Sequence, residues 1–169
     1  TLGERRHSGK LNLRAGADAL AVVAELVGMA PPTTPNTVAS DGVRRILWLG
    51  PDEWLIAVPP GDETALRAGL EDALACRHAS ITDVTDSRTV ITLMGARARD
   101  VLAKGCGLDF HPRVFRAGQC AQTTLARASV LLHQTTEEPA YDIYVDRSFA
   151  RYLWAWLEDA SLEYGFVAA

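Results

Sequence analysis

Apolar residues in the first half of the chain recur at helical spacing in two segments. Residues 17–27 place their aliphatic side chains on one helical face, and Gly28 ends the pattern. A second helix is predicted from Asp62, as its N-cap, to about Cys76. The strands expected around these helices are 10–14, 44–49, 54–58 and 80–84. The order is therefore βαββαβ.

Two connecting segments carry clear turn chemistry. Three prolines between residues 29 and 41 predict a loop without regular structure. Gly-Pro-Asp-Glu at 50–53 puts proline at the second position of a turn, where its fixed φ is favoured. The two flanking apolar runs are therefore expected to form a β-hairpin.

The second half begins the same order again with an apolar run at 88–94. A helix over 96–104 follows, ended by Gly105, and a loop reaches Gly118. The remaining expected elements are strands 119–125, 128–134 and 141–145, a helix from 147 to about 160, and a short terminal strand at 163–167.

Two successive halves of this kind predict an α+β fold of split βαβ units, with antiparallel sheet covered by helices. We expect residues 1–169 to form a single compact unit, with a first α+β half at 10–85 and a second at 86–169.

Charge and cysteine content limit the classes of partner and the cellular compartment that we expect. The net charge is −4 and the basic residues are scattered, which argues against nucleic acid as a partner. No apolar stretch reaches the roughly 18 residues that a membrane span needs. Three cysteines without paired spacing, and a polar N-terminus without a signal segment, indicate a cytoplasmic protein.

A search for catalytic or ligand-binding constellations yields none that we assign. Cys106 and His111 are the residue types of a thiolate nucleophile and its base, but their closeness in sequence does not assemble a site. A metal site from these two with Cys120 and His133 lacks any short ligand pair. No glycine-rich phosphate loop is present. We therefore predict no catalytic, cofactor-binding or metal-binding residue in this chain.

The aromatic residues carry more information than the polar ones. On the last helix one stripe is expected to face the core: Phe149, Leu153, Trp156, Leu157 and Ala160. Trp154 lies about 140° from Phe149 at helical spacing, so it leaves the helix in another direction. Because tryptophan is enriched at interfaces, Trp154 is a candidate partner contact. Phe110 and Phe115, in the loop 107–118, are expected to dock on the core or on a partner.

Several stretches together resemble one protein family. They are LNLR at 11–14, LGPDEWLI at 49–56, DVTDSRTVITLMG at 83–95, GLDFHPRVFRAG at 107–118 and RSFARYLWAWLE at 147–158. In combination and order they resemble the gamma subunit of bacterial heterotetrameric sarcosine oxidase. The resemblance extends from about residue 10 to 165, and it implies a fold similar to the folate-binding region of the glycine cleavage T-protein.

The resemblance also implies partners and an activity. Alpha, beta and delta subunits would carry FAD, FMN, NAD, zinc and tetrahydrofolate sites, and the assembly would oxidise sarcosine to glycine and hydrogen peroxide, forming methylenetetrahydrofolate. The chain itself would be a non-catalytic structural subunit, inactive in isolation. The residues leave two alternatives open: a stand-alone folate-binding one-carbon transferase-like domain, and a small-molecule-sensing α+β module.

Overall fold

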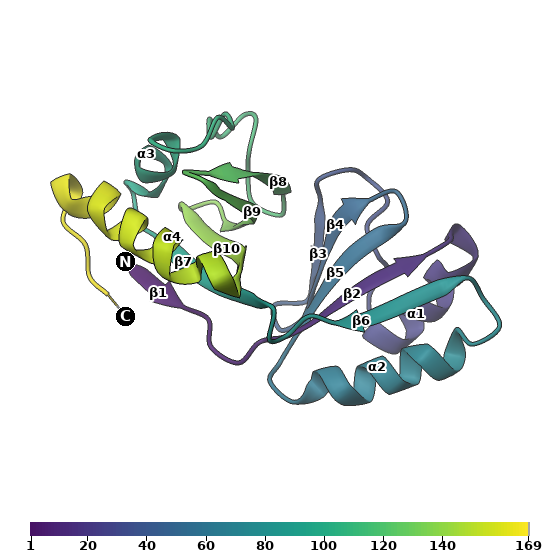
Figure 1. Cartoon of the computed structure of the whole chain (residues 1–169). Coiled ribbons are helices and arrows are strands. Elements are labelled where there is room, and N and C mark those ends of the chain that lie inside the picture. The colour runs from purple at the N-terminus through teal and green to yellow at the C-terminus, as the bar shows by residue number, and fades with distance from the viewer. Residues whose placement is uncertain (169) are drawn as a thin grey trace. The chain divides into compact units, whose positions relative to one another are not determined.

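The structure is a computed structural model that describes residues 1–168 of the 169-residue chain. It contains two compact units: residues 7–86 form one, and the other combines residues 1–6 with the chain from Ser87 onward. Each unit contains an antiparallel five-stranded sheet and helices (Figure 1). The α+β class predicted from the sequence is therefore confirmed.

The unit of residues 7–86 has the strand order β3-β4-β5-β2-β6. Its strands are β2 Gly9–Ala15, β3 Val38–Ser40, β4 Arg45–Gly50, β5 Glu53–Val58 and β6 Ala79–Asp83. Its helices are the 3-10 turn η1 Ala17–Ala19, α1 Leu20–Val27 and α2 Asp62–Ala73. Buried side chains of α1 and α2 share one core with alternate residues of β2, β4 and β5, because successive strand residues point to opposite faces.

Two details of this unit differ from the sequence predictions. The loop 29–41 contains the strand β3, which pairs with β4 at the edge of the sheet. The last proline of this loop is at position 35, so nothing prevents the following residues from joining a ladder. The N-cap of α2 is Gly61 and not Asp62, and its φ of 91° suits glycine. A Glu63 carboxylate oxygen accepts the Gly61 N–H at 2.9 Å.

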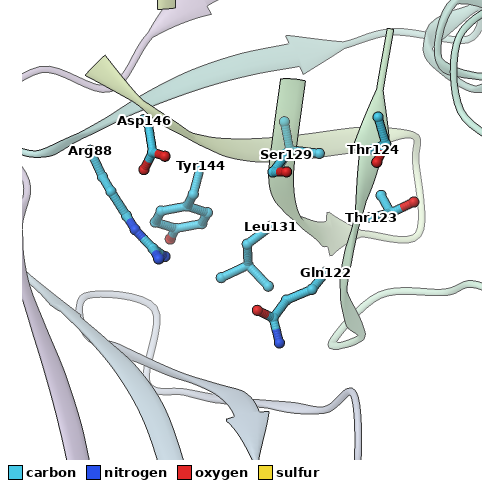
Figure 2. A pocket seen from close by; sticks show the side chains of 9 residues that line it. Arg88, Gln122, Thr123, Thr124, Ser129, Leu131, Tyr144 and Asp146 are labelled. Atoms are coloured by element: carbon cyan, nitrogen blue, oxygen red, sulfur yellow. The ribbon is translucent and has the colours of Figure 1, made fainter. Parts of the chain in front are cut away.

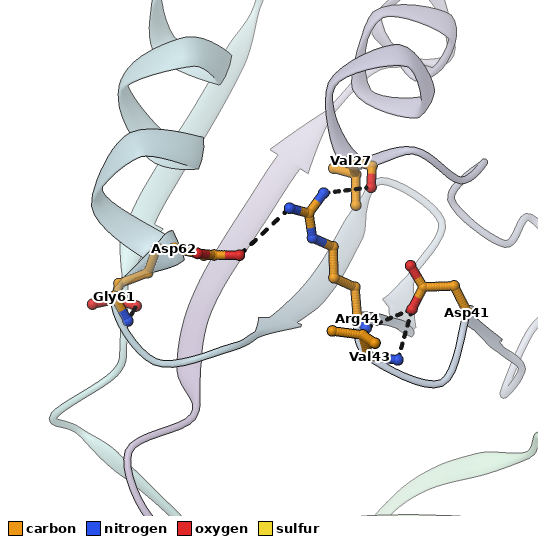
Figure 3. A network of polar contacts seen from close by, with 7 residues as sticks. Val27, Asp41, Val43, Arg44, Gly61 and Asp62 are labelled. Carbon is orange, nitrogen blue, oxygen red and sulfur yellow. Dashed lines mark hydrogen bonds and ion pairs between the residues drawn. The ribbon is translucent and has the colours of Figure 1, made fainter.

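Arg44 connects the two helices of this unit (Figure 3). Its guanidinium donates to the Val27 carbonyl at the end of α1, at 3.1 Å, and to an Asp62 carboxylate oxygen at the start of α2, at 3.4 Å. Asp41 holds the turn before it by accepting the backbone N–H groups of Val43 and Arg44. A cation at the C-terminal end of a helix is favourable because unpaired carbonyls carry partial negative charge there.

The second unit has the strand order β1-β7-β10-β9-β8. Its strands are β1 Leu2–Glu4, β7 Arg88–Met94, β8 Cys120–Leu125, β9 Ala128–Thr136 and β10 Ala140–Asp146. Its helices are α3 Ala98–Ala103, α4 Arg147–Ser161 and the 3-10 turn η2 Leu162–Tyr164. The core contains alternate residues of the sheet together with the buried sides of α3 and α4.

Both ends of the chain contribute to this second unit. The strand β1, which the sequence patterns did not predict, pairs with β7, and the Leu2 N–H donates to the Val167 carbonyl at 2.9 Å. The terminal strand expected at 163–167 is wrong: the chain makes the 3-10 turn η2 there, and Ala168 forms an isolated bridge with Leu2. One bridge to a three-residue edge strand is too short a ladder to form a regular strand.

Gly105 allows a close approach between two segments of this unit. A Cβ atom at this position would lie 2.5 Å from Cζ2 of Trp156 and 3.1 Å from the Ala126 backbone nitrogen. The helix before it ends at Ala103, with Lys104 as its C-cap in ordinary right-handed geometry. Gly105 is therefore required for the contact with Trp156, and it does not act as a left-handed helix stop.

Candidate functional site

Phe110 and Phe115, predicted from the sequence to dock on the core or a partner, lie in the core of the second unit. They are 5% and 4% exposed. Their rings meet edge to face, with centroids 6.0 Å apart, and both contact Tyr141 of β10. Burial raises the pKa of the Tyr141 phenol, whose hydroxyl donates to Gln134 at 3.3 Å. The chain's own core therefore covers both phenylalanine rings.

Trp154, the third candidate contact, is half-buried at the edge of the same core. It lines a recess of about 190 Å³ together with residues of β1, β7 and α4: Glu4, Thr89, Ile91, Ala150 and Arg151. One side of the indole packs against the core while the other faces this recess. Of the three candidate contacts, Trp154 is the one that keeps an accessible face.

The core stripe of α4 begins later than the spacing predicted. Leu153, Leu157 and Ala160 are buried, but Phe149 is 44% exposed. Phe149 lies in the first turn of the helix, before the buried positions begin. Tyr152 is 41% exposed as well, and Trp156 is partly buried against Gly105. The expectation that Phe149 faces the core is thus wrong.

Of the cysteine and histidine candidates, Cys120 and His133 are opposite residues on β8 and β9, whereas Cys106 and His111 have other partners. The Cys106 thiol lies 3.6 Å from the Thr123 hydroxyl, and His111 Nδ1 accepts the Arg113 backbone N–H at 3.2 Å. None of the three cysteines forms a disulfide within residues 1–168; Cys106 and Cys120 are buried and Cys76 is exposed. Within residues 1–168, no group of three or more His, Cys, Asp or Glu side chains is arranged to hold a metal ion.

The sheet of the second unit carries a polar cavity that sequence patterns did not reveal (Figure 2). Its volume is about 340 Å³. It is lined from four strands by Arg88, Gln122, Thr123, Thr124, Ser129, Val130, Leu131, Tyr144 and Asp146. Tyr144 and Leu131 are 2% and 3% exposed. An arginine, an aspartate and several hydroxyl groups thus surround a small apolar centre.

An ion pair between a half-buried arginine and a buried aspartate lies further along β10. An Arg5 nitrogen and an Asp142 carboxylate oxygen are 2.9 Å apart, and Asp142 is 2% exposed. Burial alone would lower the pKa of Arg5, but its hydrogen bond with Asp142 and the charge of that carboxylate raise it overall. Because the separation of such a pair would leave a buried charge uncompensated, this contact fixes residues 1–6 against the second sheet.

Comparison with known proteins places the chain in a family. A family model described as sarcosine oxidase, gamma subunit family, matches residues 13–163. The sarcosine oxidase subunit gamma of Corynebacterium sp. (strain P-1) is 39% identical over 150 residues, which cover 88% of this chain and 72% of that protein. The chain belongs to the sarcosine oxidase gamma subunit family. The family resemblance drawn from the sequence is therefore confirmed.

Solved structures agree with this family assignment. The heterotetrameric sarcosine oxidase from Corynebacterium sp. U-96 in complex with pyrrole 2-carboxylate contains a chain that is 35% identical, with a TM-score of 0.91, over 100% of this chain and 87% of that one. The glycine cleavage system aminomethyltransferase T from Bartonella henselae matches with a TM-score of 0.71 at 15% identity, over 92% of this chain and 44% of that one. This gamma subunit family member thus shares the T-protein fold, as the sequence resemblance implied.

The length and polarity of the helices bear on whether a helix of this chain can span a membrane. No helix within the described residues of this family member has the length and apolar character needed to cross a bilayer.

Proposed function

We propose that this chain is a non-catalytic, structural subunit of a heterotetrameric sarcosine oxidase. The observation that carries this proposal is the likeness, over the whole chain, to a chain of the Corynebacterium heterotetrameric enzyme. The hydrogen-bond partners of Cys106 and His111 also support it: the thiol contacts Thr123 and the imidazole accepts from Arg113, whereas a thiolate nucleophile needs a base within hydrogen-bond reach. In this proposal the oxidation of sarcosine takes place on partner subunits, and the flavin, NAD, zinc and tetrahydrofolate sites belong to them.

The partner-binding surface that we propose is centred on Trp154. The indole lies beside Arg151 at an open recess, and tryptophan and arginine are the residues most enriched among energetically dominant interface contacts. The first turn of α4 contains no acidic residue, although carboxylates are favoured there. A partner segment that carries a carboxylate would pair with Arg151 and cover the exposed face of Trp154.

Co-expression with the genes of its candidate partner subunits tests the assembly. The chain should co-purify with flavin-bearing subunits at a fixed stoichiometry, whereas the chain expressed alone should be colourless and release no peroxide from sarcosine. Peroxide release by the isolated chain would contradict the proposal, and so would the recovery of a complete, active oxidase that lacks this chain.

Two tryptophans of α4 separate the binding role from a core role. Trp154→Ala should weaken assembly by about 2 kcal/mol or more and leave the free subunit folded. Trp156→Ala is the matched control, because Trp156 packs on Gly105 within the unit. It should lower the stability of the free chain with a smaller effect on assembly. A Trp154→Ala variant that loses about 3–5 kcal/mol of stability before any partner is added would place Trp154 in the core.

A folate-binding one-carbon transferase is the second candidate, and the fold similarity to aminomethyltransferase T is the observation that favours it. Fold alone does not transfer an activity, so this candidate ranks below the first. Titration of the purified chain with tetrahydrofolate separates the two: saturable micromolar binding would favour the transferase, and its absence would favour the structural subunit.

A further inference from the structure

Two opposite charges at the rim of the polar cavity lie next to each other without forming a pair. Arg88 and Asp146 are directly opposite residues on the antiparallel strands β7 and β10. Such residues have Cβ atoms about 5 Å apart, a spacing from which an arginine can reach an aspartate and gain a favourable interaction. Nevertheless, no ion pair or side-chain hydrogen bond joins them to each other or to any other residue in the range 1–168.

The position of Asp146 makes this absence informative. Asp146 is the N-cap of α4, where an aspartate normally accepts a hydrogen bond from the first turn of the helix. Its side chain makes no capping bond here. In Figure 2 its carboxylate is directed toward the cavity, and Arg88 extends past the ring of Tyr144. An anion and a guanidinium thus lie at one site without a partner among residues 1–168.

The rest of the cavity can recognise a small polar molecule. The hydroxyl groups of Thr124 and Ser129 lie along β8 and β9. Leu131 and Tyr144 supply an almost completely buried apolar floor. At about 340 Å³, the cavity is at the lower end of the range for ligand sites, which suits a molecule of a few heavy atoms.

We propose that this cavity binds a small zwitterionic amino acid. Arg88 binds its carboxylate through two parallel N–H donors, and Asp146 accepts hydrogen bonds from its ammonium group. A zwitterion satisfies both charges at once and brings no net charge into the site. A simple carboxylate or a simple amine satisfies one of them and leaves the other without a partner. The site involves residues of the second unit alone, and it does not depend on the proposed assembly.

Nuclear magnetic resonance titration of the full ¹⁵N-labelled chain tests the site, with glycine as the probe. Propionate and ethylamine, which carry one charge each, are the matched probes. Backbone signals of Arg88, Ser129 and Asp146 should shift and saturate with glycine in the millimolar range. Each single-charge probe should bind at least about 10-fold more weakly, a difference of about 1.4 kcal/mol.

Substitutions test whether the charges of Arg88 and Asp146 bind the glycine probe. Arg88→Gln and Asp146→Asn should each weaken glycine binding about 10-fold or more, whereas Arg113→Gln, an exposed arginine outside the cavity, should leave it unchanged. Arg88→Lys, which keeps the charge but loses the planar fork, should fall between the wild type and Arg88→Gln. Circular dichroism melts check that each variant is folded.

Three outcomes would overturn the proposal. One is the absence of saturable shifts at the cavity up to about 50 mM glycine, a concentration above which binding is too weak to be specific. Another is propionate binding as tight as glycine binding, which would leave Asp146 without a role. The third is a glycine affinity that neither Arg88→Gln nor Asp146→Asn changes.

Discussion

Two arrangements of charged residues, one in each unit, differ in whether their charges have partners. In the unit of residues 7–86, Arg44 has a carbonyl partner at the end of α1 and a carboxylate partner at the start of α2. In the second unit, Arg88 and Asp146 are adjacent on paired strands and yet have no side-chain partner within the described residues. The first arrangement stabilises a fold, whereas the second leaves charge available to another molecule.

The large apolar residues on the helices of the two units also differ in how far they are exposed. In α1 and α2 the large apolar residues face the core of their unit, with Leu26 a marginal exception at 37% exposed. In α4, Phe149 and Tyr152 are more exposed, and Trp154 borders an open recess. Because exposed aromatic residues are enriched at interfaces, the comparison points to the second unit as the one that binds partners and ligands.

The largest expected effect is a loss of stability, and it tests whether the second unit is tightly packed despite its exposed aromatic residues. Phe115→Ala should cost about 3–5 kcal/mol in the free energy of unfolding, because the ring is 4% exposed and contacts both Phe110 and Tyr141. The neighbouring Val114 is 54% exposed, so Val114→Ala should change stability by less than about 0.5 kcal/mol. Urea denaturation of both variants measures the difference. Equal losses would mean that the loop is loosely held.

Gly105 provides a second test of packing in the same unit. Gly105→Ala should destabilise the chain by about 1–3 kcal/mol, because the new methyl group would lie 2.5 Å from the Trp156 ring. Gly107→Ala is the control, since a Cβ atom there meets nothing within 4 Å. Denaturant midpoints of the two variants measure this difference in stability. A neutral Gly105→Ala would show that Trp156 is free to move away.

Local sequence patterns predicted the positions of the strands better than they predicted which strands pair. The run at 88–94 became β7 with those bounds, because β-branched and apolar residues fill it. The three residues of β1 carry no periodic signal, and their partner β7 lies about 90 residues further along the chain. The hairpin of β4 and β5 formed as predicted, since its turn lies between its strands. Signals that are local in sequence were therefore sufficient for local structure.

The candidate site required pairing information that the sequence does not display. Arg88 and Asp146 are 58 positions apart, and the register between β7 and β10 is what brings them together. Asp146 alone resembles an ordinary helix N-cap, so its residue type gave no reason to expect a free carboxylate. Trp154 was found from helical spacing because its angle to Phe149 on the same helix separated it from the expected core stripe. Sites within one element are thus the ones that spacing reveals.

The contrast between the two arginines predicts a moderate difference in stability. Arg44→Gln should lower the free energy of unfolding by about 1 kcal/mol, because it removes hydrogen bonds to Val27 and Asp62. Arg88→Gln should change it by less than about 0.5 kcal/mol, because no side-chain partner in the described part of the chain is lost. Thermal melts at equal ionic strength compare the two. A larger loss for Arg88→Gln would mean that this guanidinium stabilises the fold, which would reverse the comparison.

The smallest expected effect concerns two lysines whose pKa values move in opposite directions. Burial lowers the pKa of Lys10, which is 4% exposed, although the charges of Asp83, Asp86 and Glu63 oppose this shift. The folded unit of residues 7–86 therefore binds this proton less tightly than the unfolded chain does. The charged lysine lowers the stability of the folded state, and this loss is complete below the folded pKa. Lys10→Met should be more stable than the wild type at neutral pH, and the difference should vanish as the pH rises toward 10.5.

Lys104 of the second unit is the matched control with the opposite sign. A hydrogen bond with Glu163 raises its pKa, so the folded state binds this proton more tightly and gains stability below the ordinary value of 10.5. Lys104→Met should therefore be less stable than the wild type at neutral pH, and its deficit should disappear once the pH rises through the raised pKa. Urea denaturation of the wild type and both variants at several pH values between neutrality and that range gives the two differences. A loss of stability in both variants at neutral pH would show that the carboxylates around Lys10 outweigh its burial.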